Sequence, residues 1–204
     1  MTNARSQTKA EQRAMTTAKL IKISRELFAE LGYAQTPTEE VVRRAGVTRG
    51  ALYHHFGSKE GLFHAVVVAI QQELAEQIVA NAEQAEGLWQ QLLEGCRAFL
   101  QASLDPEVQQ ILLVDAPAVL GNETWRQIDA EYSREPLAWV LGELEKHRII
   151  QTASVTAAVH LLSGAMNEAA LWIAQAKQPD EALEQALQTL AQMLDGFRVA
   201  TADV

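Results

Sequence analysis

The 204-residue sequence predicts an all-α fold of about nine helices, and three observations lead to this prediction. Ala, Leu, Glu and Gln dominate the composition, whereas there are only 11 glycines and 5 prolines. Apolar residues recur every three or four positions, which is the spacing of one helical face. No stretch alternates apolar and polar residues as a half-buried strand does, so no strand is predicted.

The first helix is expected to follow a polar N-terminal arm of about 14 residues. Thr16 or Thr17 can cap its start, and Gly32 suits the left-handed position that ends a helix. Its apolar stripe consists of Leu20, Ile21, Leu27, Phe28 and Leu31, with Ser24 on the same side. This stripe predicts one buried face.

Three further helices have explicit boundaries. Thr36, Pro37 and Glu39 form the pattern of an N-cap, an N1 proline and a reciprocal N3 glutamate, and Gly46 ends that helix after Ala45. Thr48 can cap a short helix that reaches Phe56. Ser58 then opens a long fourth helix to about Ala82.

About five more helical segments follow residue 85, separated mainly by glycine and proline. Pro136 falls inside the stretch 123–146 and is expected to kink or restart that helix. The helix over 155–176 is apolar all round, which predicts burial on both sides. The final helix has one wide apolar stripe. Core packing explains this stripe, and a self-association face explains it equally; as an interface it would include Leu161, Trp172, Leu183, Leu187, Leu190 and Leu194.

Composition excludes several classes of protein. The single cysteine, Cys96, cannot form an internal disulfide, so a reducing cytoplasm is expected. The apolar runs are too short for a membrane span, so no membrane partner is expected. The net charge of −9 divides unevenly, with +4 over residues 1–65 and −13 over the remainder. This asymmetry favours a small head that faces a polyanion, on an acidic body.

The stretch 36–63 carries the strongest functional signal. A short helix, a glycine turn and a second short helix form the arrangement that places a recognition helix in the major groove of DNA. Val41, Ala45, Val47, Leu52 and Phe56 can hold the two helices together. The second helix would present donors and aromatic rings outward, and these are Thr48, Arg49, Gly50, Tyr53, His54 and His55.

This stretch resembles the TetR/AcrR family of transcriptional regulators over about 45 residues. The matching residues are Leu27-Phe28, Gly32-Tyr33, Thr36, Glu39-Glu40-Val41, Arg44-Ala45-Gly46-Val47-Thr48, Gly50, Leu52-Tyr53, His55-Phe56 and Ser58-Lys59-Glu60 before Leu62. The segment 111–121 resembles a C-terminal subtype of the family. Ser24 and Arg25 depart from the family pattern, since they replace usual apolar positions in the first helix.

The resemblance implies a homodimeric regulator, most simply a repressor that a small-molecule effector releases from a palindromic operator in double-stranded DNA. It implies a DNA-binding head over residues 1–60 and a ligand-binding and dimerisation body over 61–204. The residues that it places at DNA are Thr36, Arg44, Val47, Thr48, Arg49, Gly50, Ala51, Tyr53, His54, His55 and Lys59. No cofactor and no metal are expected.

Large aromatic and polar side chains of the body could line a ligand pocket or belong to an ordinary core. These residues are Trp89, Cys96, Phe99, Trp125, Trp139, His160, Met166 and Asn167. If Glu94, Asp115 or Glu168 faces a pocket, a lipophilic cation is a plausible ligand. Cys96 is open to a redox role, although a single cysteine among apolar neighbours is usually inert packing.

Two other function classes compete with a DNA-binding regulator. The sequence has no G-x-S-x-G, Walker A, G-x-G-x-x-G or H-E-x-x-H pattern, so an enzyme is not expected. A helical dimer that binds small molecules or acts as a scaffold without binding DNA is the alternative. The basic head, with Gly46 and Lys59 in place, argues against it.

Overall fold

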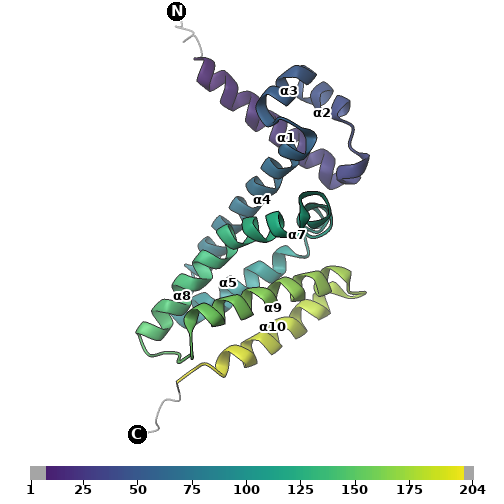
Figure 1. Cartoon of the computed structure of the whole chain (residues 1–204). Helices are drawn as coiled ribbons and strands as arrows, with labels where there is room; N and C mark the ends of the chain where they lie inside the picture. Colours follow the sequence, from purple (N-terminus) through teal and green to yellow (C-terminus); the bar gives the residue numbers. More distant parts are fainter. Residues whose placement is uncertain (1–7, 200–204) are drawn as a thin grey trace, which may run out of the picture.

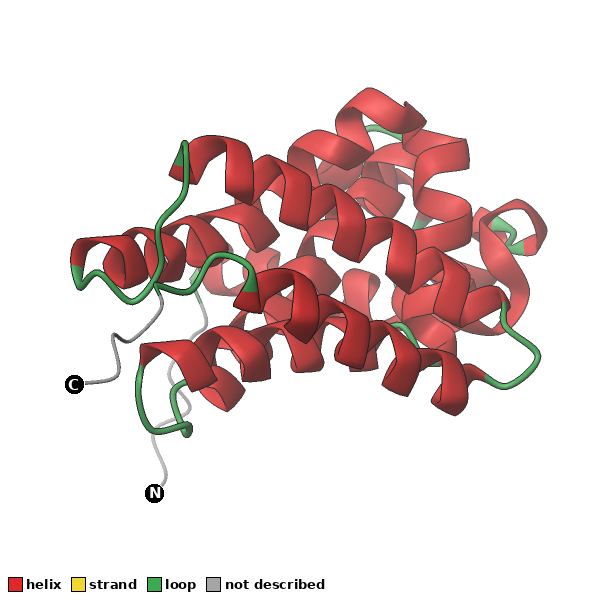
Figure 2. Ribbon diagram, turned by 90° about the horizontal axis from the view of Figure 1, so that it is seen from below, coloured by secondary structure: helices red, strands yellow, loops and turns green. Residues whose placement is uncertain are grey.

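The computed structural model describes residues 8–199, and these residues are almost entirely helical (Figures 1 and 2). A single antiparallel bridge, between Ile150 and Arg198, is the one β-type pairing in this range. The helices are α1 (Lys9–Gln35), α2 (Thr38–Ala45), α3 (Arg49–Phe56), α4 (Lys59–Ala82), α5 (Leu88–Ala102), α6 (Pro106–Val108), α7 (Ala116–Asp129), α8 (Glu135–Lys146), α9 (Val155–Gln175) and α10 (Pro179–Asp195), with the π-helical segments η1 (Gln109–Asp115) and η2 (Ala130–Arg134). The all-α prediction is therefore confirmed.

The start of α1 differs from the sequence prediction. Thr8 caps the helix by accepting a hydrogen bond from the Glu11 backbone N–H, and the Glu11 carboxylate accepts one from the Thr8 N–H. This reciprocal capping box satisfies two N–H groups that have no partner within the helix, so α1 begins about eight residues before Thr16. The expected arm of 14 residues is thus wrong for residues 8–14, and its first seven residues lie outside the described part.

The start of α2 also differs. Pro37, not Thr36, is the N-cap of α2, and no side chain caps the helix. The predicted caps Thr48 and Ser58 are confirmed, because their hydroxyls accept hydrogen bonds from the backbone N–H groups of Ala51 and Gly61.

Residues 106–146 form one nearly continuous helical run with local irregularities. The backbone breaks at Gly121, whose φ of 79° lies in the left-handed region, and η2 comes directly before Pro136. If this run is counted as two helices that meet at Gly121, residues 8–199 contain nine helices: α1 to α5, the two parts of the run, α9 and α10. This agrees with the about nine helices predicted from the sequence. The expected irregularity at Pro136 takes the form of a π-helical segment, which accommodates the missing proline N–H.

The core has three parts. Leu20, Leu27, Val41, Leu52 and Leu62 pack together in the head, with others. A second cluster around Phe28, Phe63 and Ile111 joins α1, α4 and η1. The third and largest cluster lies among α5, α8, α9 and α10, which lie together at the far end of α4 in Figure 1. Helix α4 is therefore the element that runs from the head into the body.

Candidate nucleic-acid interface and ligand cavity

Helices α2 and α3 form the predicted helix-turn-helix. Gly46 ends α2 with φ 63° and ψ 36°, a left-handed conformation that glycine adopts without steric cost. Val41, Ala45 and Leu52 are buried between the two helices and α1, while Val47 and Phe56 pack against them. These contacts fix the direction of α3 and leave its other face free.

The free face of α3 carries most of the residues expected at DNA. Thr48, Arg49, Gly50, Tyr53 and His54 are exposed, and Val47 and Ala51 are half-buried beside them. The Arg49 guanidinium donates to the Glu39 carboxylate (Nη1 to Oε1, 2.9 Å) and lies 5.4 Å from the centre of the Tyr53 ring. This face therefore offers hydrogen-bond donors and the rings of Tyr53 and His54 to a groove.

The cations at the edge of this face are already ion-paired. Glu40 accepts hydrogen bonds from Arg43 (2.6 and 2.8 Å) and from Arg44 (2.8 Å), and these bonds lower the pKa of Glu40 to about 2. Arg44 is exposed, as a phosphate contact requires. Phosphates that contact Arg43 or Arg44 must therefore compete with the Glu40 carboxylate for these two guanidinium groups.

His55 lies at the contact between α3 and α1. Its Nδ1 is 2.9 Å from the Thr17 hydroxyl, and its ring is half-buried. Burial, Arg13 and the neighbouring His54 lower the pKa of His55, so the ring is mainly neutral at pH 7 and shares one hydrogen bond with the Thr17 hydroxyl. In this conformation His55 fixes α3 against α1, in addition to the phosphate contact expected of it.

Two residues expected at DNA are directed elsewhere. Thr36 is fully buried, and its hydroxyl donates to the Gly32 carbonyl oxygen at 2.8 Å, so a phosphate contact is wrong for this side chain. Lys59 is half-buried because its ammonium group donates to the Tyr33 carbonyl oxygen (2.5 Å) and lies 4.1 Å from the centre of the Tyr33 ring. Burial lowers the pKa of Lys59. Lys59 therefore fastens α4 to the end of α1 in this conformation.

Polar contacts join the head to residues 105–115 of the body. Arg25, on α1, donates to Glu107 (Nε 2.9 Å, Nη2 2.7 Å) and to Glu73 of α4 (2.5 Å). Nearby, the Asp115 carboxylate accepts the Tyr33 backbone N–H at 2.8 Å. The departure from the family pattern at Arg25 thus creates an ion-pair cluster, Arg25–Glu73–Glu107, between head and body.

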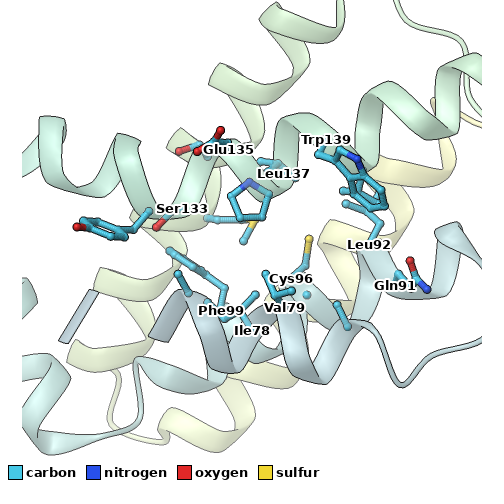
Figure 3. A pocket seen from close by; sticks show the side chains of 18 of the residues that line it. Ile78, Val79, Gln91, Leu92, Cys96, Phe99, Ser133, Glu135, Leu137 and Trp139 are labelled. Carbon is cyan, nitrogen blue, oxygen red and sulfur yellow. The ribbon is translucent and has the colours of Figure 1, made fainter. Parts of the chain in front are cut away.

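The body contains a cavity of about 810 Å³ between α4, α5, η2, α8 and α9, here called the body cavity (Figure 3). Val79 of α4 and Cys96 and Phe99 of α5 lie on one side, and Leu137 and Trp139 of α8 lie on the other (Figure 3). The interior is mainly apolar, and the Cys96 thiol is buried there. Burial raises the pKa of Cys96 to about 12, so a thiolate is scarce at pH 7 and a redox role is disfavoured.

The residues expected in a pocket divide between several places. Cys96, Phe99, Trp139 and Met166 line the body cavity. Trp125 and Asn167 line a smaller adjoining cavity of about 40 Å³, here called the side cavity. For His160 and Trp89 the pocket assignment is wrong. His160 is exposed on α9, and Trp89 is half-buried in the core, with the Arg198 guanidinium 4.9 Å from its ring centre.

The carboxylates at the cavity differ from those considered from the sequence. Asp115 is at the joint with the head, Glu94 lies 3.7 Å from Arg97, and Glu168 is exposed on α9. Instead Glu83, Glu131 and Glu135 line the body cavity. The signal that could have found Glu131 is Pro136, since the π-helical segment that precedes α8 carries residues 131–133 on the cavity wall, and Glu135 directly precedes this proline.

The face of α9 and α10 is apolar and exposed. Leu161 is 73% exposed and Trp172 46%, and Met193 of α10 is exposed beside them, so the expected burial of α9 on both sides is not met within one chain. For Leu161 and Trp172, which are exposed in the single chain, the interface assignment stays a prediction. It is wrong for Leu183, Leu187 and Leu194, which pack into the core of their own chain because the apolar stripe of α10 faces α5 and α9. Leu190 belongs to this core and also lines the groove beside Trp172, so its assignment stays a prediction.

Family models match both parts of the chain. Residues 20–66 match the model described as "Bacterial regulatory proteins, tetR family", and residues 89–197 match "Tetracyclin repressor-like, C-terminal domain". The second match alone covers more than half of the sequence. The chain belongs to the TetR family. It is therefore a DNA-binding transcriptional regulator, and the alternative of a dimer without DNA-binding activity has no support.

Known relatives agree with this assignment. A solved TetR-family regulator from Pectobacterium atrosepticum is 36% identical, covers 95% of this chain and 99% of its own, and superposes with a TM-score of 0.82. The Tn10 TetC protein of Escherichia coli is 24% identical over 149 residues, which are 73% of this chain and 75% of TetC. The repressor AcnR of Corynebacterium glutamicum is 33% identical over 88 residues, but these are only 43% of this chain and 40% of AcnR.

TetR-family regulators are not enzymes, and they bind DNA as dimers that respond to small molecules. Within residues 8–199, every helix is too short or too polar to cross a bilayer.

Proposed function

We propose that this TetR-family regulator is a homodimeric repressor that binds a palindromic operator and is released by a small molecule held in the body cavity. The observation that carries the proposal is the position of the body cavity at the far end of α4 from the head. Helix α4 begins at Ser58, directly after the recognition helix, and its last turns (Ile78, Val79, Ala82) line the cavity. A ligand that displaces α4 at the cavity therefore displaces the head.

A second connection supports the same proposal. The helical run 106–146 holds α1 through Glu107 and Asp115 and forms a cavity wall through residues 131–140. A ligand that prefers one arrangement of this run shifts the population of head positions, by no more than its difference in affinity for the two arrangements. The cavity and the head are thus joined along two independent elements.

The exposed apolar residues on α9 and α10 support dimerisation. Leu161, Trp172 and Met193 lie beside a groove lined by both helices, where a second copy would cover them. A dimer with two-fold symmetry presents two copies of α3, which reach successive major grooves when they are about 34–36 Å apart. This geometry requires an operator with inverted half-sites.

A structural neighbour gives limited support for the effector. RolR, 16% identical with a TM-score of 0.70, was solved in complex with resorcinol. At this identity the likeness concerns the fold, so it supports a small-molecule site in the body and does not identify the ligand.

Selection from a randomised duplex library tests the proposal. The enriched sequences should contain two inverted half-sites about 10 base pairs apart or a multiple of that spacing, and a Leu161→Glu variant should lose the enrichment with its dimer. Binding to a single half-site by a monomer would contradict the proposal. With the selected operator, gel shifts across a library of small amphipathic molecules then identify those that release DNA.

A further inference from the structure

The charge on the cavity walls is of one sign. Glu83, Glu131 and Glu135 line the body cavity, and Asp129 lines the side cavity. Among residues 8–199, no lysine, arginine or histidine lines either cavity. Such a wall attracts cations and repels carboxylates and phosphates, most strongly where water is excluded.

The side cavity continues the body cavity towards a buried carboxylate. The two cavities share wall residues, including Ile78, Phe99 and Ser133. Asp129 is only 3% exposed, and its carboxylate accepts hydrogen bonds from the Asn167 amide (3.0 Å) and the Ser133 hydroxyl (3.3 Å). Both donors are uncharged, and no ion pair within 4.0 Å reaches Asp129 in the described part of the chain.

A buried carboxylate without a cationic partner is costly, so its retention calls for a reason. Arg126 and Arg134 are the nearest cations along the chain, but neither lines a cavity and neither makes an ion pair with Asp129. The Trp125 indole N–H, on the same wall as Asp129, is also buried and lacks an acceptor. An ammonium group cannot accept a hydrogen bond from this N–H, so the feature of the side cavity that favours a cation is the buried Asp129 carboxylate with its two uncharged partners.

We propose that the two cavities together take an amphipathic primary amine in its ammonium form. Its apolar body fills the space between Phe99 and Trp139, and its ammonium group donates to Asp129. A primary ammonium suits the site because about 40 Å³ admits a group of the size of a water molecule but no trimethylammonium. This inference rests on the proposed function, since it assigns a chemical class to the effector of that cavity.

A matched ligand series tests the charge directly. Decylammonium, decanol and decanoate have the same chain length and differ in charge, and calorimetry measures their binding without DNA. Decylammonium should bind about tenfold or more tightly than decanol, because its charge attracts the Asp129 carboxylate in addition to the hydrogen bond, and decanoate should bind most weakly because its charge is repelled. The affinity of decanol shows how tightly an uncharged ligand binds, including any hydrogen bond that its oxygen accepts from the Trp125 N–H.

Variants locate the effect. Asp129→Asn keeps the size of the side chain and an acceptor oxygen but removes the charge, so decylammonium should lose about tenfold in affinity and decanol should lose clearly less. Glu184→Gln removes one exposed carboxylate on α10, away from both cavities, and should change neither affinity. If Asp129→Asn does not fold, the exposed pair Glu131→Gln and Glu135→Gln replaces it, with a smaller loss of decylammonium affinity expected.

The outcomes separate this inference from the proposed function. Equal or tighter binding of decanol or decanoate, or unchanged decylammonium binding to Asp129→Asn and to the Glu131/Glu135 variant, would overturn the inference. Release of the operator by decanol without preference for the cation would leave the proposed function intact and still overturn the inference. Cation-selective binding without release of DNA would support the inference and contradict the effector role of the cavity.

Discussion

Replacing Arg25 by methionine tests how strongly the head is held to the body. Methionine is unbranched and apolar, so Arg25→Met removes the ion pairs with Glu73 and Glu107 and keeps most of the side-chain volume. Helix propensity changes little, since arginine and methionine are both good helix formers. The variant therefore isolates the polar contacts between α1, α4 and α6.

The expected loss of stability is about 1–2 kcal/mol. Arg25 makes two charge-assisted hydrogen bonds to Glu107, and its side chain is 27% exposed while that of Glu107 is 25% exposed. Such bonds contribute about 1.5–3 kcal/mol when well shielded. The contribution here is smaller, because Glu107 can regain water in the variant and Glu73 is mostly solvated. For a chain of this length the loss corresponds to a decrease of about 2–8 °C in melting temperature.

Thermal denaturation of wild type and variants at one protein concentration measures the effect, since a dimer melts at a concentration-dependent temperature. Arg97→Met is the matched control. Arg97 also faces two glutamates, but its guanidinium nitrogens lie 3.7 Å from the Glu94 carboxylate and 3.8 Å from that of Glu184, and its side chain is more exposed than that of Arg25. Arg97→Met should therefore lower the free energy of unfolding by about 0.5 kcal/mol or less. A double-mutant cycle of Arg25→Met with Glu107→Gln should give a coupling of about 1 kcal/mol.

Two results would refute this reasoning. An Arg25→Met variant no less stable than Arg97→Met would show that the Arg25–Glu73–Glu107 cluster does not stabilise the joint. A coupling near zero in the double-mutant cycle would show that the stability of Arg25 comes from packing of its aliphatic chain instead.

Three further predictions concern other surfaces. Arg49→Ala should weaken operator binding about 5- to 150-fold in gel shifts, the range for one specific contact to a base, whereas Lys177→Ala should not; equal affinities would remove Arg49 from the interface. Trp172→Glu should give a monomer in sedimentation or light scattering at micromolar concentration, because dimerisation would bury its charge; an intact dimer would place the interface elsewhere. Because the folded-state pKa of His55 is lowered, the unfolded chain binds more protons below about pH 6.5, so stability should fall as pH decreases from 7 to 5. His55→Gln should reduce this fall in urea denaturation, and an unchanged pH dependence would contradict the assignment.

Local sequence signals predicted the head well. The left-handed Gly46, the caps Thr48 and Ser58, and the buried residues Val41 and Leu52 all depend on contacts within a few residues or on one helical face. Such signals can be read from sequence because helix ends and helical periodicity are determined locally. The capping box at Thr8 and Glu11 is equally local, and the three-residue spacing of the pair could have placed the start of α1.

The sequence by itself determined the helical content, the family and the exposed face of the recognition helix, since each follows from spacing along one helix or from an ordered motif. Only the tertiary structure decided which side chains meet across helices. In the folded chain, Thr36 and Lys59 bind backbone carbonyl groups of the head instead of facing DNA. The apolar stripe of α10 packs into the core of its own chain, whereas Leu161 and Trp172 stay exposed. It also brought Asp129 beside the body cavity. The physical reason is that helical periodicity defines an apolar face, whereas the neighbour that covers this face depends on how distant segments pack.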